Sequence, residues 1–118
     1  IRIIIMNIFI DIDDTICRTP DNGDYSRAEP IPDRVEKVNS LYDEGHVIVF
    51  WTARGSGTGI DWADVTQRQL QAWGVRYHQL MFGKPAFDVF IDDKSVNSNM
   101  FFDNFTINAT QEQTEGEE

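Results

Sequence analysis

Two aspartates, two positions apart, directly follow an apolar run near the start of the chain. Asp11 and Asp13 come after the run Ile8–Ile10. On an extended segment, side chains two positions apart point in the same direction. Two like charges held together repel each other and resist the loss of water, so such a pair usually serves chemistry. The spacing therefore predicts a bound cation, a shared proton, or a nucleophile beside its acid–base partner.

Further polar residues stand at the ends of apolar runs later in the chain. Thr52 follows the run VIVFW, Asp92 and Asp93 follow FDVFI, and Lys84 precedes that last run. If these runs are parallel strands of one sheet, their carboxyl ends meet at one edge and the polar groups converge there. Carboxylate oxygens with room for water suit Mg²⁺ better than zinc, which prefers nitrogen and sulfur. A lysine, a hydroxyl and Mg²⁺ around one point suit a phosphoryl group, so the set predicts phosphate chemistry.

The elements that would position these residues alternate between strand and helix. Nearly continuous apolar runs predict buried strands, and apolar positions three or four apart predict amphipathic helices. The alternation predicts an α/β fold with a central parallel sheet, right-handed crossovers and both faces covered, which is a Rossmann-like three-layer sandwich. The predicted strands are Ile3–Ile10, Val47–Trp51, Phe87–Ile91 and a weaker Val75–Met81, and the predicted helices are Asp33–Glu44, Asp61–Trp73 and Ser95–Phe102.

Turn-forming residues separate these elements. Thr19–Pro32 contains three prolines and is predicted to be a loop or a short hairpin, which we call the flap. Gly55–Gly59 reads as a glycine-rich turn. Gly45 and Gly74 are expected to end the first two helices, and Asp61 is expected to cap the start of the second.

The composition indicates one domain, which we predict to span residues 1–108. The chain has 118 residues, of which 41% are hydrophobic, and a net charge of −10. This charge argues against a general nucleic-acid-binding protein, because phosphate backbones need a basic surface. Residues 109–118 form an acidic tail, which is predicted to be disordered. The single cysteine, Cys17, excludes an internal disulfide and fits a cytoplasmic setting, and the apolar start is too short to span a bilayer.

The aspartate pair and the later polar positions resemble the motifs of the haloacid dehalogenase superfamily, specifically its aspartate-nucleophile phosphatases. The first motif of that family, D-x-D-x-T after a strand, matches Asp11 to Thr15. The second, a Ser or Thr after a strand, matches Thr52, and the third, a lysine often followed by proline, matches Lys84. The fourth, an acid pair after a strand, matches DD at 92–93, so all four motifs occur in order over about Asn7–Phe102.

The resemblance implies a Mg²⁺-dependent phosphatase with assigned roles. Asp11 would attack phosphorus to give an aspartyl-phosphate. Asp13 would protonate the leaving oxygen and then act as base for the hydrolytic water. Lys84 would neutralise charge on the nucleophile and the transferred group. The Mg²⁺ ligands would be Asp11, the backbone carbonyl of Asp13, and Asp92, with Asp93 helping directly or through water.

The resemblance also implies the residues that contact the phosphoryl group. Thr52 and the backbone at Ala53 would bind phosphoryl oxygens, and Thr15 would orient the first loop. Arg54, two residues after Thr52, has two interpretations that stay open: it touches the substrate, or it pairs with one of the acids. Arg18 lies in the flap, which is expected to face the substrate.

The spacing between the motifs leaves no room for the cap domain that many members of this superfamily carry. An uncapped site accepts large substrates or is covered by a neighbouring subunit, so a homo-oligomer is one expectation. The strings WTARG and WGVRYHQLMFGKP are also similar to small phosphatases of bacterial capsule and surface-polysaccharide synthesis. This looser resemblance implies a phosphorylated sugar as substrate. The acidic charge and the short apolar start predict neither a nucleic acid nor a membrane as partner.

Two other functions compete with this interpretation. A receiver-type signalling domain also joins a small parallel sheet to paired acids, a Thr, a Lys and Mg²⁺. Its phosphorylated aspartate follows a middle strand, whereas the run VIVFW here ends at Thr52. A phosphatase acting on polynucleotide 3′ ends shares the capless core, but the acidic composition counts against it.

Overall fold

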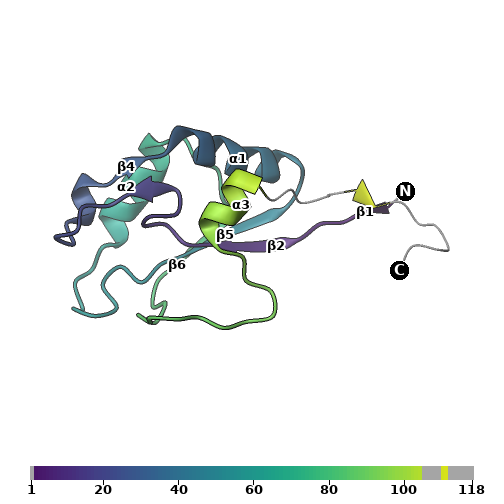
Figure 1. Ribbon diagram of the computed structural model, residues 1–118. Coiled ribbons are helices and arrows are strands. Elements are labelled where there is room, and N and C mark those ends of the chain that lie inside the picture. Colours follow the sequence, from purple (N-terminus) through teal and green to yellow (C-terminus); the bar gives the residue numbers. More distant parts are fainter. Residues whose placement is uncertain (1, 105–109, 112–118) are drawn as a thin grey trace.

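The computed structural model describes residues 2–104 and 110–111, with side chains described for residues 4–103. Its centre is a three-stranded sheet in the order β2-β5-β6 (Figure 1). The elements are β1 (Arg2–Ile3), β2 (Asn7–Ile10), β3 (Cys17–Arg18), a 3-10 turn at Tyr25–Arg27, β4 (Glu29–Pro30), α1 (Pro32–Asp43), β5 (Val47–Trp51), α2 (Ala63–Ala72), β6 (Gln79–Met81), α3 (Ser98–Asn104) and β7 (Thr110–Gln111).

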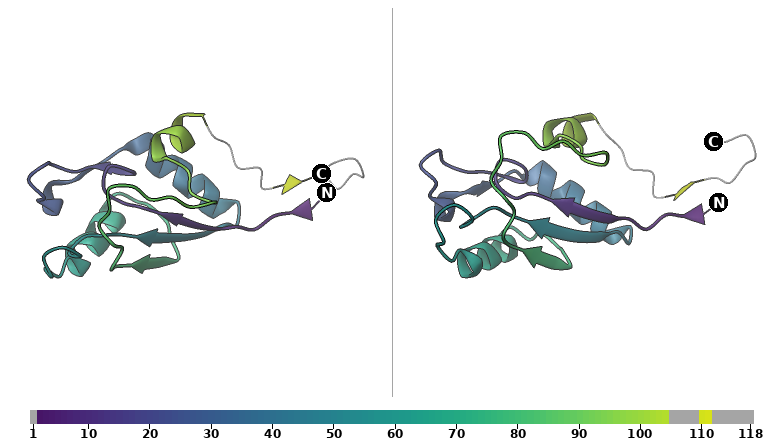
Figure 2. Two further views of the ribbon diagram at one scale, coloured as in Figure 1. Left: turned by 60° about the horizontal axis from the view of Figure 1, so that its bottom comes forward. Right: turned by 90° about the horizontal axis from the view of Figure 1, so that it is seen from below.

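The central sheet is parallel, and helices connect its strands. β2 pairs with β5, and β5 pairs with β6, both in parallel. Because both right-handed crossovers step in the same direction along the sheet, α1 and α2 lie on the same face of it (Figures 1 and 2). The connection from β6 to α3 passes over the opposite face. The predicted Rossmann-like, three-layer α/β fold is thus confirmed. The third layer is the β6–α3 connection, which lies on the face opposite α1 and α2.

The two long helices follow from their apolar spacing and their end residues. In α1, Val35, Val38 and Leu41 are buried at intervals of three residues, and Gly45 follows with a φ of 101°. In α2 the expected cap is displaced by one position: Trp62 is the N-cap residue, while the side chain of Asp61 accepts a hydrogen bond from the Ala63 N–H at 2.9 Å. Both helices were therefore predicted to within two residues at each end.

The hydrophobic core lies between the sheet and these two helices. Ile48 and Phe50 of β5 are fully buried, as are Val38 of α1 and Leu70 of α2. The turn after β2 adds Ile12 and Ile16, which are also fully buried. Their packing in the core fixes this turn on the end of the sheet. The polar residues of the same turn are held at the carboxyl end of the sheet as a result.

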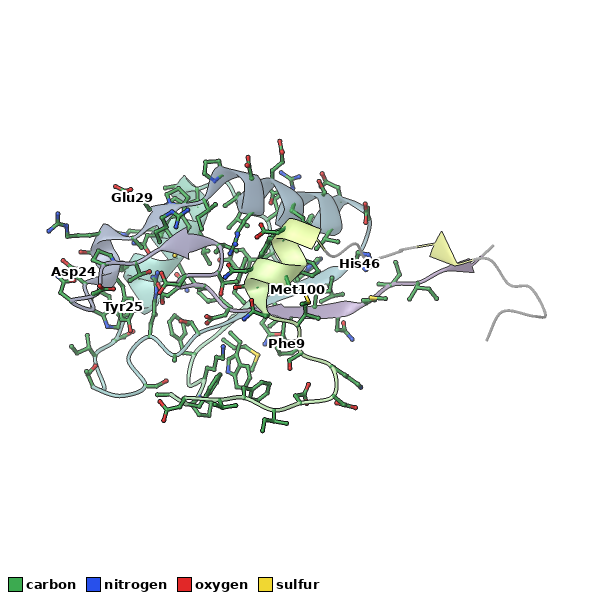
Figure 3. All side chains as sticks on the ribbon, in the orientation of Figure 1. Phe9, Asp24, Tyr25, Glu29, His46 and Met100 are labelled. Atoms are coloured by element: carbon green, nitrogen blue, oxygen red, sulfur yellow. The ribbon has the colours of Figure 1, made fainter. Side chains whose placement is uncertain are left out.

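The first predicted strand is shorter and less buried than expected. Ile3–Ile10 divides into β1 and β2, and residues 4–6 lie outside both strands. Within β2, Ile10 is buried while Phe9, which points to the opposite face, is 57% exposed and lies below β2 in Figure 3. The prediction of a fully buried strand was wrong because β2 is an edge of the central sheet and, in the described part of the chain, no helix covers the Phe9 face.

The predicted strand Phe87–Ile91 was wrong. Residues 82–97 contain no strand or helix, and the side chains of the run are exposed, up to 91% for Ile91. The rings of Phe87 and Phe90 lie 5.3 Å apart. In an extended strand, residues three apart point to opposite faces, so this contact marks a locally folded segment. The apolar composition predicted a strand, but Asp88 interrupts the run and the local ring contact replaces sheet pairing.

The last helix and the tail complete the fold. α3 begins three residues later than predicted and packs against α1. The Lys37 ammonium of α1 donates to the Phe101 carbonyl at 2.8 Å. The Arg34 guanidinium lies 4.9 Å from the centre of the Phe102 ring. Thr110–Gln111 pairs with β1, and the rest of the predicted disordered tail lies outside the described residues. Within the described part of the chain, no helix is long and apolar enough to cross a membrane.

Candidate active site

Asp11 and Lys84 meet at the carboxyl end of the sheet. The Lys84 ammonium lies 3.4 Å from one carboxylate oxygen of Asp11, and the Thr15 hydroxyl donates to the other at 3.3 Å. Burial raises the pKa of Asp11, and the charge of Lys84 offsets part of that rise. The result is a partly buried carboxylate, with 33% of its side chain exposed and one cation facing it, which is a suitable state for a nucleophile.

Thr52 connects Lys84 to the sheet through its backbone. The Thr52 N–H donates to the Met81 carbonyl at 2.9 Å, which extends the pairing of β5 with β6 by one residue. The Lys84 N–H then donates to the Thr52 carbonyl at 3.1 Å. These bonds fix the start of the 82–97 connection beside β5. Lys84 therefore reaches Asp11 although two strands of the sheet separate their positions in the chain.

The Thr52 side chain is fully buried. Its hydroxyl oxygen accepts a hydrogen bond from the Arg54 N–H at 3.1 Å, which closes a tight turn after β5. Ala53, the other predicted phosphate contact, is half-buried in this turn. The Ser56 hydroxyl donates to the Lys84 carbonyl at 2.8 Å, so the turn and the lysine loop support each other.

Asp13 is held by Arg54 in a two-point ion pair. The Arg54 Nε donates to Asp13 Oδ2 at 2.9 Å, and Nη2 donates to Oδ1 at 2.8 Å. The Thr19 hydroxyl donates to the same Oδ1 at 2.5 Å. Asp13 keeps 20% of its side chain exposed, whereas that of Arg54 is fully covered. Arg54 therefore pairs with an acid in this structure, which is one of the two interpretations left open by the sequence.

The turn between Asp11 and Cys17 has a special backbone. Asp14 adopts a φ of 58°, in the left-handed region that Asp and Asn tolerate better than most residues. Its side chain is exposed and accepts a hydrogen bond from the Thr19 N–H at 3.2 Å. Cys17 is buried behind the turn, and burial raises the pKa of its thiol to about 11. The thiol is thus a packed, protonated group rather than a reactive one.

The acids Asp92 and Asp93 are not brought to this cluster. Both are exposed in the 82–97 connection, and one carboxylate oxygen of Asp92 accepts a hydrogen bond from the Lys94 N–H at 2.9 Å. Among the described residues, no group of three or more Asp, Glu, His or Cys side chains could hold a metal ion. The arrangement therefore does not fit the magnesium centre expected from the sequence, in which Asp92 and Asp93 join Asp11 and the backbone carbonyl of Asp13.

The flap residue Arg18 also lies apart from the cluster. It lies on β3, exposed, and lines a shallow cleft that shares no residue with the Asp11 surroundings. The other lining residues are Ile31, Asp33, Arg34, Phe102 and Asp103. Arg34 in this cleft donates to the Thr15 carbonyl at 2.9 Å, so it contacts the first loop through the backbone of that loop.

Three polar residues around Asp13 and Arg54 were missed by the sequence reasoning. Thr19 donates to Asp13, while Thr66 and Gln69 accept hydrogen bonds from Arg54. Thr66 and Gln69 stand three apart, so they share one face of a helix, and a polar pair on that face was the available signal. Nothing in the spacing of Thr19 marks it as a partner of Asp13.

Comparison with known proteins supports the fold. No protein family and no curated protein matches the chain. The crystal structure of an MCSG target from Vibrio cholerae is similar, with 25% identity, a TM-score of 0.72, and coverage of 84% of this chain and 89% of that one. A chain in the structure of a Pnkp1/Rnl/Hen1 complex is 13% identical, with a TM-score of 0.54, and the match covers 86% of this chain and 35% of that one. These similarities support the α/β architecture.

Proposed function

We propose that the protein is a phosphomonoester hydrolase that works through an aspartyl-phosphate on Asp11. The observation that carries the proposal is the pairing of each of two acids with its own cation at one sheet edge. Asp11 faces the Lys84 ammonium at 3.4 Å, and Asp13, two residues on, is held by Arg54. A nucleophilic carboxylate beside a positioned acid–base group is the arrangement that a two-step phosphoryl transfer needs.

In the first step, an oxygen of Asp11 attacks phosphorus. The bond between phosphorus and the leaving oxygen breaks, and the leaving oxygen takes the electron pair and the proton of Asp13. In the second step, water attacks phosphorus and gives its proton to Asp13. The bond between phosphorus and Asp11 then breaks, which frees inorganic phosphate and restores both carboxyl groups.

Lys84 contributes by its charge and its attachment to the sheet. It has 19% of its side chain exposed, so its attraction for phosphoryl oxygens is less screened than that of a surface lysine. Its N–H is bonded to the Thr52 carbonyl, which holds the ammonium near Asp11 before substrate arrives. A cation already placed beside the reacting groups stabilises the negative charge of the transition state.

The proposal includes Mg²⁺ and a phosphorylated sugar or similar small metabolite in the cytoplasm. The case for Mg²⁺ is the acid pair that follows the 87–91 run in the sequence. For Asp92 or Asp93 to share an ion with Asp11, the 82–97 connection would have to move toward β2. Loss of turnover on treatment with EDTA, restored by Mg²⁺ alone, would support the cation requirement.

The test is steady-state hydrolysis of p-nitrophenyl phosphate by the wild type, Asp11→Asn and Asp14→Asn. Asp14→Asn is the matched control because it removes the same charge from the same turn, tolerates a φ of 58°, and keeps an oxygen for the Thr19 N–H. We expect many turnovers for the wild type and the control and none for Asp11→Asn. Circular dichroism should show that all three proteins are folded.

Two results would overturn the proposal. Turnover by Asp11→Asn near the wild-type rate would exclude Asp11 as the nucleophile. Incorporation of one stable phosphoryl group per chain from acetyl phosphate, without turnover, would indicate a signalling phospho-acceptor instead.

A further inference from the structure

Arg54 is a buried cation whose hydrogen-bonding capacity is almost fully used inside the protein. The residue is 2% exposed. Its Nε and Nη2 donate to the Asp13 carboxylate. Its Nη1 donates to the Thr66 hydroxyl at 3.0 Å and to the Gln69 side-chain carbonyl at 2.6 Å. Because guanidinium carries only five N–H donors in a fixed plane, this pattern leaves one for any other partner.

Gln69 also binds the flap. Its amide nitrogen donates to the Tyr25 carbonyl at 2.7 Å, while its amide oxygen accepts from Arg54. The Tyr25 ring covers the guanidinium, with 4.9 Å between the ring centre and Cζ, and the ring meets Trp62 edge to face at 5.0 Å. Figure 3 shows Tyr25 at the end of the molecule where the flap lies. A continuous set of contacts thus runs from the flap through Gln69 and Arg54 to Asp13.

We propose that Arg54 is a positioning residue that sets the orientation of the Asp13 carboxyl group, and that Gln69 fixes Arg54 and the flap relative to each other. This inference rests on the proposed function, in which Asp13 moves the proton. A substrate-binding arginine needs N–H groups directed at open space, whereas the Arg54 side chain is fully covered. Two parallel bonds to one carboxylate fix its plane as well as its place, which a single ammonium does not do.

The leaving group separates a positioning role from a merely structural one. An alkyl phosphate releases an alkoxide-like oxygen that needs a proton in the transition state, whereas p-nitrophenol leaves as a stable phenolate. A misaligned Asp13 therefore slows the first step selectively for alkyl phosphates, whereas its effect on the second step, in which it acts as base, is common to both substrates. The ratio kcat/KM reports the first step and is the quantity to compare. General damage to the fold would slow both substrates by the same factor, and loss of a substrate contact would raise KM for both.

The experiment compares Arg54→Lys, Gln69→Ala and the control Arg68→Lys on glucose 6-phosphate and p-nitrophenyl phosphate. Arg68 is an exposed arginine on α2 whose contact is an ion pair with Asp64 at 3.2 Å. For Arg54→Lys we expect kcat/KM on the sugar phosphate to fall about 100-fold, the scale of general acid catalysis. The fall in kcat/KM on the nitrophenyl ester should be under a tenth of that. Gln69→Ala should also lose more activity on the sugar phosphate than on the nitrophenyl ester, with a smaller loss than Arg54→Lys. Arg68→Lys should match the wild type on both substrates.

The outcomes divide cleanly. Equal losses of kcat/KM on the two substrates, or no loss on either, would overturn the positioning role while leaving the proposed function intact. A wild type inactive on both substrates would overturn the proposed function and this assignment with it. If Arg54→Lys does not fold, Gln69→Ala decides: selective loss on the sugar phosphate supports the role, and equal loss or no loss overturns it.

Discussion

Gly55 stands where a side chain would displace the turn that carries Thr52 and Arg54. Its φ is 84°, and a Cβ added there would lie 2.2 Å from the Ile60 carbonyl oxygen. Ordinary contact begins at 3.4 Å, so Gly55→Ala requires the turn to open by about 1 Å. Gly59 is the matched control, since its φ is 79° and a Cβ there meets nothing within 4 Å.

Both alanine variants carry the cost of a left-handed backbone, and only Gly55→Ala adds the overlap. We expect Gly59→Ala to lower the free energy of unfolding by about 1 kcal/mol and to leave turnover unchanged. Gly55→Ala should lower the free energy of unfolding by about 3 kcal/mol, because overpacking adds about 2 kcal/mol. Its turnover should fall about 100-fold, since a shift of about 1 Å near reacting groups has effects of that size.

Urea unfolding followed by tryptophan fluorescence gives the two stabilities, and hydrolysis of p-nitrophenyl phosphate gives the two rates. If Gly55→Ala proves as mild as Gly59→Ala in both measurements, the turn at 53–60 is not packed as described. A Gly55→Ala protein that loses stability but keeps full turnover would instead show that this turn does not position the reacting groups.

Three further predictions concern single side chains. Burial raises the pKa of Asp11 above its ordinary value of 3.8, so the native state binds that proton more tightly than the unfolded chain. The stability of the wild type relative to Asp11→Asn should therefore fall as pH rises through the window between 3.8 and the native pKa, and urea unfolding at several pH values measures this difference. Cys17, with a thiol pKa of about 11 and no exposure, should resist iodoacetamide at pH 8 until the protein unfolds; rapid labelling of the native protein would contradict its burial. Leu70→Ala, at a fully buried position of α2, should lower the free energy of unfolding by about 3 kcal/mol, and a loss under 1 kcal/mol would mean that the core at this helix is loosely packed.

The sequence predicted the parts of the fold that depend on local patterns. Val47–Trp51 is β5 without change, and the amphipathic spacing placed α1 and α2 within two residues at each end. The approach of Lys84 to Asp11 was also predictable, because carboxyl ends of parallel strands share one edge. These results rest on periodicity and on a general rule of topology.

Pairing between distant segments was not predictable in the same way. The run FDVFI has the composition of a strand whether or not a partner receives it, and in this structure Phe87 contacts Phe90 instead of a neighbouring strand. The same limit applies to Arg54, whose partner is set by how α2 and the first turn pack together. The role of Thr19, and the bond from Gln69 to the Tyr25 carbonyl, depend in the same way on three-dimensional neighbours rather than on sequence spacing.

The two acids of the first turn differ in the cation that each one faces, and the difference suits their proposed roles. Asp11 meets an ammonium at 3.4 Å, a single point charge on a flexible stem that can follow the carboxylate as it bonds to phosphorus. Asp13 meets a planar guanidinium through two bonds, which restricts rotation of its carboxyl group. A nucleophile must move toward its target, whereas a proton donor works best at a fixed place. Exchanging the cations should therefore impair both steps: a lysine at 54 loosens the donor, and an arginine at 84 restrains the nucleophile.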